Sequence, residues 1–199
     1  MAVVNTYALV NLDNARDFLQ LKGDQETREN VLIDIINHVS NRIESYCDRH
    51  FISRGELTEY YDGNGTNKLF TRYYPITAVS NIYSDTDWAW GSDTEITSDY
   101  YRIGQNSRYI LLKNDNFEED YQNIKVIYTA GYTDRSSLPD DLRHACLLHV
   151  YRIYQKYWKN ADVAVSDVSD DSGGRSYLSE QFDPEVKGIL DTYRRVHAC

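Results

Sequence analysis

The sequence predicts an α+β fold that is mainly α: a small helical bundle, an inserted antiparallel β-rich region and a tethered C-terminal helix. Three observations support this prediction. Apolar residues recur with a helical period in three segments, short alternating segments with turn residues lie between the second and the third, and a polar stretch precedes the last helix. The predicted core covers residues 1–160, the linker residues 161–183, and the C-terminal helix residues 184–199.

The first two helices are predicted at residues 12–22 and 28–50. Asp13 is expected to be the N-cap of the first helix and Gly23 its stop. In the second, at about 100° per residue, seven side chains fall within an arc of roughly 120°. They are Leu32, Ile35, Ile36, Val39, Ile43, Tyr46 and Cys47. Polar residues occupy the opposite face, so this helix is expected to bury one side.

The β-rich insertion is predicted at residues 51–135. Residues 59–61 and 68–70 flank an Asp-Gly-Asn-Gly run that suits a hairpin loop, because both glycines tolerate positive φ. Pro75 favours an extended approach to a further strand at residues 76–83. Three more strands are predicted at residues 100–103, 109–113 and 123–129. Short strands with short turns indicate an antiparallel sheet or a small barrel.

The third helix is predicted at residues 139–159. Pro139 suits a first helical turn, and Asp140 and Asp141 complement the helix dipole. Its apolar arc spans about half the circumference, which is wide enough to contact both the second helix and a neighbour. A narrow polar stripe beside this arc consists of His149, Arg152, Lys156 and Lys159.

The segment between the third helix and the C-terminal helix reads as a flexible acidic linker. Residues 161–183 carry six acids and one base, with Gly173 and Gly174 at the centre. In the following helix, Val186, Ile189, Leu190 and Tyr193 share one side. Such a helix either docks another protein or packs back on its own domain, and the sequence leaves both open.

Composition narrows the function. A net charge of −10 disfavours tight binding to nucleic acid, because that affinity comes largely from cations that displace counterions. The three cysteines cannot all pair within one chain, so a reducing compartment is expected. No segment is long and apolar enough to span a bilayer, so we expect a soluble, unsecreted protein without membrane contact. We also expect that the protein has no cofactor.

Catalytic constellations are not evident in the sequence. Cys146 and His149 are three residues apart on a predicted helix, but no orienting acid or oxyanion donor accompanies them. A half-buried thiol beside a surface imidazole is the simpler expectation. Two alternatives to a structural role stay open: a hydrolase built on this pair or on paired acids, and a single-stranded nucleic-acid binder that stacks bases on the Tyr-rich β-region.

A series of motifs resembles the head-tail connector, or head-completion adaptor, proteins of tailed bacteriophages. The motifs follow the order of that family and cover roughly residues 12–158. They are Leu12-x2-Ala15-Arg16-x2-Leu19, Ile43-Glu44-x-Tyr46-Cys47-x-Arg49-x-Phe51, Tyr61-x-Gly63-x-Gly65, Tyr74-Pro75-Ile76, Val126-Ile127-Tyr128-Thr129-Ala130-Gly131-Tyr132 and Leu138-Pro139-x2-Leu142-x2-Ala145.

The resemblance implies a non-enzymatic virion protein of the phage neck, assembled in the host cytoplasm. Copies would form a ring, commonly of about twelve subunits, beneath the portal protein. The ring would extend the DNA channel, let double-stranded DNA pass without sequence recognition, and meet a downstream stopper or tail protein. Another neck or tail-completion role is the runner-up.

This resemblance also directs the expected contact residues. Portal docking is expected on the C-terminal helix, at Val186, Ile189, Leu190, Tyr193 and Arg194. A ring interface is expected on the apolar arc of the third helix, at Val150, Tyr154, Tyr157 and Trp158. The stripe of His149, Arg152, Lys156 and Lys159 is expected to face the channel or an acidic neighbour.

Overall fold

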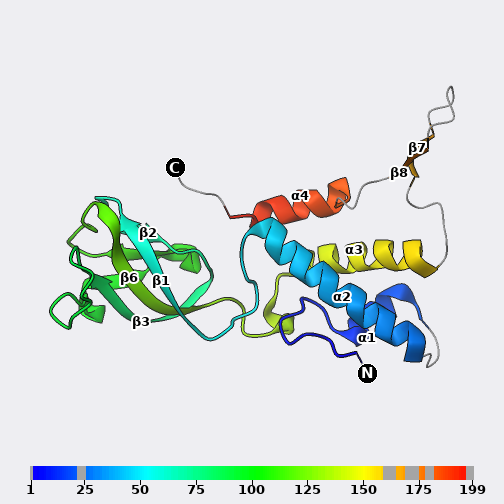
Figure 1. Cartoon of the computed structure of the whole chain (residues 1–199), viewed down its shortest axis with the longest axis horizontal. Helices are drawn as coiled ribbons and strands as arrows, with labels where there is room; N and C mark the ends of the chain where they lie inside the picture. The colour runs from blue at the N-terminus through cyan, green and yellow to red at the C-terminus, as the bar shows by residue number, and fades with distance from the viewer. Residues whose placement is uncertain (1, 22–25, 159–164, 169–174, 178–181, 196–199) are drawn as a thin grey trace. The chain divides into compact units, whose positions relative to one another are not determined.

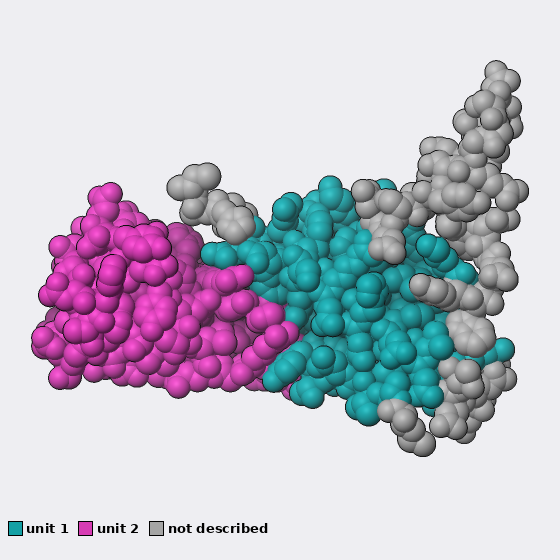
Figure 2. Space-filling view, in the orientation of Figure 1, with its two compact units in different colours: residues 1–49, 135–199 teal, residues 50–134 magenta. Residues whose placement is uncertain are grey.

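The computed structural model describes residues 2–21, 26–158, 165–168, 175–177 and 182–195. The chain divides into two compact units, coloured teal and magenta in Figure 2: unit 1 comprises residues 1–49 and 135–199, and unit 2 comprises residues 50–134. Helix accounts for 39% of the structure and strand for 25%, which confirms the predicted α+β class with more helix than strand. No helix in the described ranges combines the length and apolar character needed to cross a bilayer.

Unit 1 is a bundle of helices, shown in Figure 1. Its members are α1 (Leu12–Leu19), α2 (Glu26–Cys47), α3 (Asp140–Trp158) and α4 (Pro184–Tyr193). Helix α2 contacts each of the other three helices, and so does α3. The buried positions of α3 follow the helical period and include Leu142, Cys146 and Val150. The predicted arc of α2 is likewise inside, with Leu32, Ile36, Val39 and Ile43 fully covered.

The ends of α1 differ from the prediction. Asn11, not Asp13, is the N-cap: its side-chain oxygen accepts a hydrogen bond from the Asn14 N–H at 2.7 Å. The helix ends at Gln20, whose left-handed backbone (φ 53°) closes the last turn, while the predicted stop Gly23 lies outside the described residues. Either Asn or Asp can cap a helix, so residue type alone could not decide whether the N-cap is Asn11 or Asp13.

Unit 2 contains two three-stranded antiparallel sheets. The first has the order β1-β6-β3, formed by β1 (Glu56–Gly63), β6 (Asp120–Ala130) and β3 (Ile76–Ser84). The second has the order β2-β5-β4, formed by β2 (Lys68–Phe70), β5 (Tyr109–Leu112) and β4 (Tyr101–Ile103). Short 3-10 turns lie at Ser98–Tyr100, Gln105–Ser107 and, in unit 1, Arg135–Ser137. The inner faces of the two sheets share one core that includes Leu69, Ile82, Ile110 and Val126.

The predicted hairpin between residues 59–61 and 68–70 is wrong. β1 pairs with β6 and β2 pairs with β5, so the two segments belong to different sheets. The glycines between them lie instead where the chain passes from the first sheet to the second. Gly63 donates its N–H to the Asn123 side chain at 2.8 Å, and a Cβ there would lie 1.6 Å from the Glu118 carbonyl oxygen. Turn residues mark a change of direction, but long-range packing decides which strand is the partner.

Part of the predicted linker forms a small hairpin of β7 (Val165–Val168) and β8 (Arg175–Tyr177). The predicted flexibility of residues 161–164, 169–174 and 178–181, which include Gly173 and Gly174, concerns positions outside the described residues.

Candidate functional site

Three of the sequence motifs meet at one joint within unit 2. The Tyr132 N–H donates to the Phe51 carbonyl at 2.8 Å, the Ser53 N–H donates to the Tyr132 carbonyl at 2.8 Å, and the Gly131 N–H donates to the Pro75 carbonyl at 2.9 Å. Gly131 has φ of +104°, and a Cβ there would lie 2.8 Å from the Ser53 nitrogen. Only glycine suits this close approach. The motifs are therefore structural joints.

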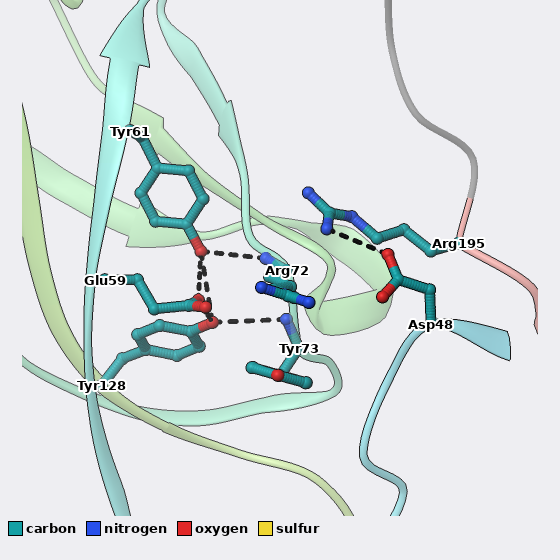
Figure 3. A network of polar contacts seen from close by, with 7 residues as sticks. All are labelled: Asp48, Glu59, Tyr61, Arg72, Tyr73, Tyr128 and Arg195. Atoms are coloured by element: carbon teal, nitrogen blue, oxygen red, sulfur yellow. Dashed lines mark hydrogen bonds and ion pairs between the residues drawn. The ribbon is translucent and has the colours of Figure 1, made fainter. Parts of the chain in front are cut away.

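A carboxylate and two phenols form a half-buried network in the same unit (Figure 3). Tyr61 and Tyr128 both donate their hydroxyls to Oε2 of Glu59, the first at 2.5 Å. The two phenol oxygens then accept backbone N–H groups from Arg72 (2.9 Å) and Tyr73 (3.3 Å). Burial, with the nearby Glu59 charge, raises the pKa of both phenols, so they stay protonated as donors. The network ties the segment before β3 to β1 and β6.

Cys146 and His149 do not form a nucleophilic pair. Both are buried, at 0% and 2% exposure, which corrects the expected half-buried thiol beside a surface imidazole. Burial raises the pKa of the Cys146 thiol to about 12 and lowers the pKa of His149 to about 4. A neutral thiol in a dry interior is inert as a nucleophile at neutral pH. In the described residues, no group of three or more His, Cys, Asp or Glu could hold a metal ion.

The residues expected at the ring interface are partly internal. Val150 and Tyr154 are 1% and 4% exposed, so they belong to the core of unit 1. The Tyr157 and Trp158 side chains lie outside the described residues. A helical wheel groups apolar residues on one arc, but it does not tell whether that arc meets its own chain or a neighbour.

The expected channel stripe is divided between interior and surface. His149 is buried and packs against the Phe182 ring, with centroids 4.6 Å apart. Arg152 forms an ion pair with Asp183 at the start of α4. Lys156 is exposed, and Lys159 lies outside the described residues. Only Lys156 among these four is therefore described as an exposed cation.

Helix α4 is docked within unit 1 by its apolar side. Val186 and Leu190 are 1% and 0% exposed, Ile189 and Tyr193 are half-buried, and Arg194 is exposed. The Tyr193 hydroxyl donates to Asp141 of α3 at 2.5 Å. After the helix, Arg195 pairs with Asp48 at 3.4 Å (Figure 3), and its N–H donates to the Cys47 carbonyl at 3.0 Å. Three of the five residues expected to dock the portal, Val186, Leu190 and Tyr193, therefore hold α4 in place.

The contact that anchors the start of α4 was missed by sequence reasoning. Phe182 packs edge-on against Tyr46 at 5.2 Å and lies under the Arg42 guanidinium at 5.1 Å, in addition to its contact with His149. A lone Phe at the end of a polar linker was the available signal.

Comparison with known proteins identifies the family. A model of the head completion protein family matches residues 8–196. The chain belongs to this family. Among curated proteins, no sequence matches the chain.

Solved structures share the fold of this head completion protein. A chain titled "Neck of empty GTA particle computed with C6 symmetry" has a TM-score of 0.59 and 18% identity over 100% of this chain and 95% of that chain. The neck of a native gene transfer agent (GTA) particle, computed with C12 symmetry, gives 0.56 and 16% over 100% and 95%. A chain from the virion of the native particle gives 0.56 and 16% over 99% and 94%. At these identities the likeness is one of fold.

Proposed function

We propose that this head completion protein is a structural component of the neck of a phage-like virion. The observation that carries the proposal is the family match over residues 8–196. The fold shared over nearly the whole chain with neck chains of gene transfer agent particles supports it. The buried Cys146 and His149 agree with a role without catalysis, because a pKa of about 12 keeps the thiol protonated and a pKa of about 4 makes the imidazole a weak base.

In this role, copies of the chain form a ring under the portal protein, about twelve subunits in number. The ring extends the DNA channel and joins the head to a downstream stopper or tail protein. A subunit of charge −10 lets a polyanion slide past without trapping it. The exposed Lys156 is the proposed contact to DNA or an acidic neighbour, and the end of α3 with Tyr157 and Trp158 is a proposed contact between copies.

Portal attachment is proposed for α4. Because Val186 and Leu190 are buried inside unit 1, the contact is assigned to the exposed side of the helix, including Arg194 and the half-buried Ile189 and Tyr193. The guanidinium of Arg194 lies over the Tyr46 ring at 5.4 Å, and the N–H donors of a guanidinium suit a carboxylate of the portal.

The test is to mix the purified chain with the matching portal and image the particles by electron microscopy. We expect an added ring of density on one side of the portal. Portals that carry no added ring at saturating chain would contradict the neck assignment. An Arg194→Glu variant is expected to lower ring occupancy, while Lys187→Ala, also exposed on α4, is the matched control and should leave it unchanged.

A further inference from the structure

Unit 2 carries opposite charges on its two sheets. The segments that build and flank β2, β4 and β5, residues 67–75 and 101–113, contain five basic residues and no acidic one. The segments that build and flank β1, β3 and β6, residues 56–66, 76–100 and 114–130, contain twelve acidic residues and one basic residue. A separation this complete within one small unit produces two surfaces of opposite potential.

The outer faces of the two sheets point away from each other. Leu69 and Ile110 of the second sheet and Ile82 and Val126 of the first belong to one buried core. Side chains alternate along a strand, so the residues between these core positions face outward. Unit 2 therefore has a basic outer face on β2-β5-β4. The outer face of β1-β6-β3, called the acidic face, is bordered by acids: Glu56 and Asp62 of β1 are exposed, and most of the other acids lie in the loops after β3 and before β6.

The basic face combines cations with uncovered aromatic surface. Cross-strand partners Lys68, Leu111 and Arg102 form one outward row, and Phe70 and Tyr109 form the next. Phe70 is 56% exposed and packs on Tyr109 with centroids 5.4 Å apart. Nearby, the Arg108 guanidinium lies over the Tyr74 ring at 4.7 Å. Aromatic side chains with arginines are the composition typical of protein interfaces.

The acidic face likewise presents aromatic side chains. Its outward row is Tyr60, Lys125 and Tyr83, with Trp90 packed on Tyr60 at 5.6 Å. The Lys125 ammonium lies over the Tyr83 and Trp90 rings at 5.4 and 5.9 Å, which shields this single cation.

Acids and a further aromatic pair surround that row. Glu56 starts β1, Glu95 pairs with Tyr83, and Asp87 is exposed in the following loop. Trp88, 55% exposed, donates its indole N–H to the carbonyl of Tyr121, which is 62% exposed. The face therefore offers ring surface bordered by carboxylates.

We infer that the basic face of unit 2 binds the acidic face of unit 2 in a second copy of this chain. The inference rests on the proposed assembly of several copies. The two faces are complementary in charge and both expose aromatic rings, so each supplies what the other needs. They also lie on opposite sides of the unit, as a head-to-tail contact requires. In a ring of about twelve, each subunit turns by only about 30°, so the donor and acceptor faces must be nearly opposed.

The experiment is a charge exchange in the full-length chain. One variant reverses the basic face (Lys68→Glu, Arg102→Glu, Arg108→Glu), and a second reverses the acidic face (Glu56→Lys, Asp87→Lys, Glu95→Lys). A third carries both sets. Self-association is measured by sedimentation equilibrium without portal, at low and high salt and up to about 1 mM, because charge-driven contacts weaken with salt. The control reverses two exposed charges of unit 1, Asp34→Lys and Lys187→Glu.

We expect each single-face variant to lose self-association by at least about tenfold. An equimolar mixture of the two should associate again, and so should the variant with both faces reversed, because acid then meets base at every contact. The control should match the wild type. Thermal melting of each variant separates loss of contact from loss of fold.

Three outcomes would overturn the inference. The first is a wild-type chain that stays monomeric at every concentration, and the second is a mixture of the two single-face variants that does not recover self-association. The third is a basic-face variant that keeps self-association but loses salt-dependent binding to DNA, which would assign that face to the nucleic acid. None of these outcomes touches the neck assignment, because the ring on the portal is scored separately with the wild-type chain.

Discussion

The two units use their aromatic and apolar side chains differently. In unit 1 the apolar arcs of α2, α3 and α4 are turned into a shared interior, so most residues that looked suited to contact a partner are already occupied. Unit 2 leaves large rings uncovered: five of the seven exposed large hydrophobic side chains in the described residues belong to it. Surface that is apolar and unused is where a second protein is expected to bind.

The contrast also concerns charge. The ion pairs described in unit 1 join segments of that unit, as Arg152 with Asp183 and Arg195 with Asp48 do. Between residues 56 and 130 of unit 2, the basic residues other than Lys125 and the acidic residues lie in segments of different sheets, an arrangement that suits attraction to another copy. Unit 1 is therefore treated as the scaffold and unit 2 as the assembly surface, and the following predictions test that division.

The largest effect is expected where α4 joins the scaffold. Leu190→Ala should lower the free energy of unfolding by about 3 kcal/mol, within a typical range of about 2 to 5, because it leaves a cavity under a fully buried side chain. Chemical denaturation measures it. Lys187→Ala, on the exposed side of α4, is the control and should change little. A loss below about 1 kcal/mol for Leu190→Ala would show that α4 is a loosely held docking helix.

A fall in pH should lower the stability of unit 1, where His149 is buried. Burial lowers the pKa of His149 from 6.5 to about 4, so the unfolded chain binds its proton at a higher pH than the folded chain does. Stability is then complete above pH 6.5 and is lost as pH falls toward 4, by up to about 3 kcal/mol. Besides burial, the charged or titratable groups that act on His149 are Arg42, Arg152, Asp183 and His38.

Replacing the titrating group isolates this contribution. A His149→Phe variant should lose less stability than the wild type between pH 6.5 and 4, measured as the denaturation midpoint against pH. The comparison uses slopes, so a constant offset from the altered packing against Phe182 does not affect it. Parallel curves for the two proteins would show that His149 does not carry the acid sensitivity of unit 1.

Sequence reasoning succeeded where a local period is sufficient. The α+β class follows from patterns that lie within single segments, as in the arc from Leu32 to Cys47. It failed where a partner distant in the chain decides the outcome. β1 pairs with β6 because Tyr128 and Val126 share its core face, and no local signal between residues 56 and 70 reports this.

The expected sites illustrate the same limit. Val150, Tyr154, Val186 and Leu190 were chosen for apolarity on a helix, which is also the property of a core residue. The separation of basic and acidic residues between the two sheets of unit 2 can be recognised in the sequence only after the strands are assigned to sheets, because basic and acidic segments alternate along the chain.

The joint of unit 2 provides a test at a backbone position. Gly131→Ala should cost about 2 kcal/mol or more, because φ of +104° is unfavourable for a residue with a Cβ, and that atom would lie 2.8 Å from the Ser53 nitrogen. Gly188→Ala in α4 is the matched control. Nothing lies within 4 Å of its Cβ, and alanine favours helix, so no loss is expected. Equal effects for the two substitutions would contradict the structural role of Gly131.

The smallest effect is expected in the Tyr–Glu network, which stabilises the sheet behind the proposed acidic face. Tyr128→Phe removes the donor to Glu59 and the acceptor for the Tyr73 N–H, at a cost of about 1 to 2 kcal/mol. The exposed Tyr121→Phe is the control, with a change within about 0.5 kcal/mol. Since Tyr61 donates to the same carboxylate, the double variant Tyr61→Phe/Tyr128→Phe should depart from the sum of the single effects. Additive losses in thermal or chemical unfolding would show two independent contacts, and the network would then not unite β1 with the segment before β3.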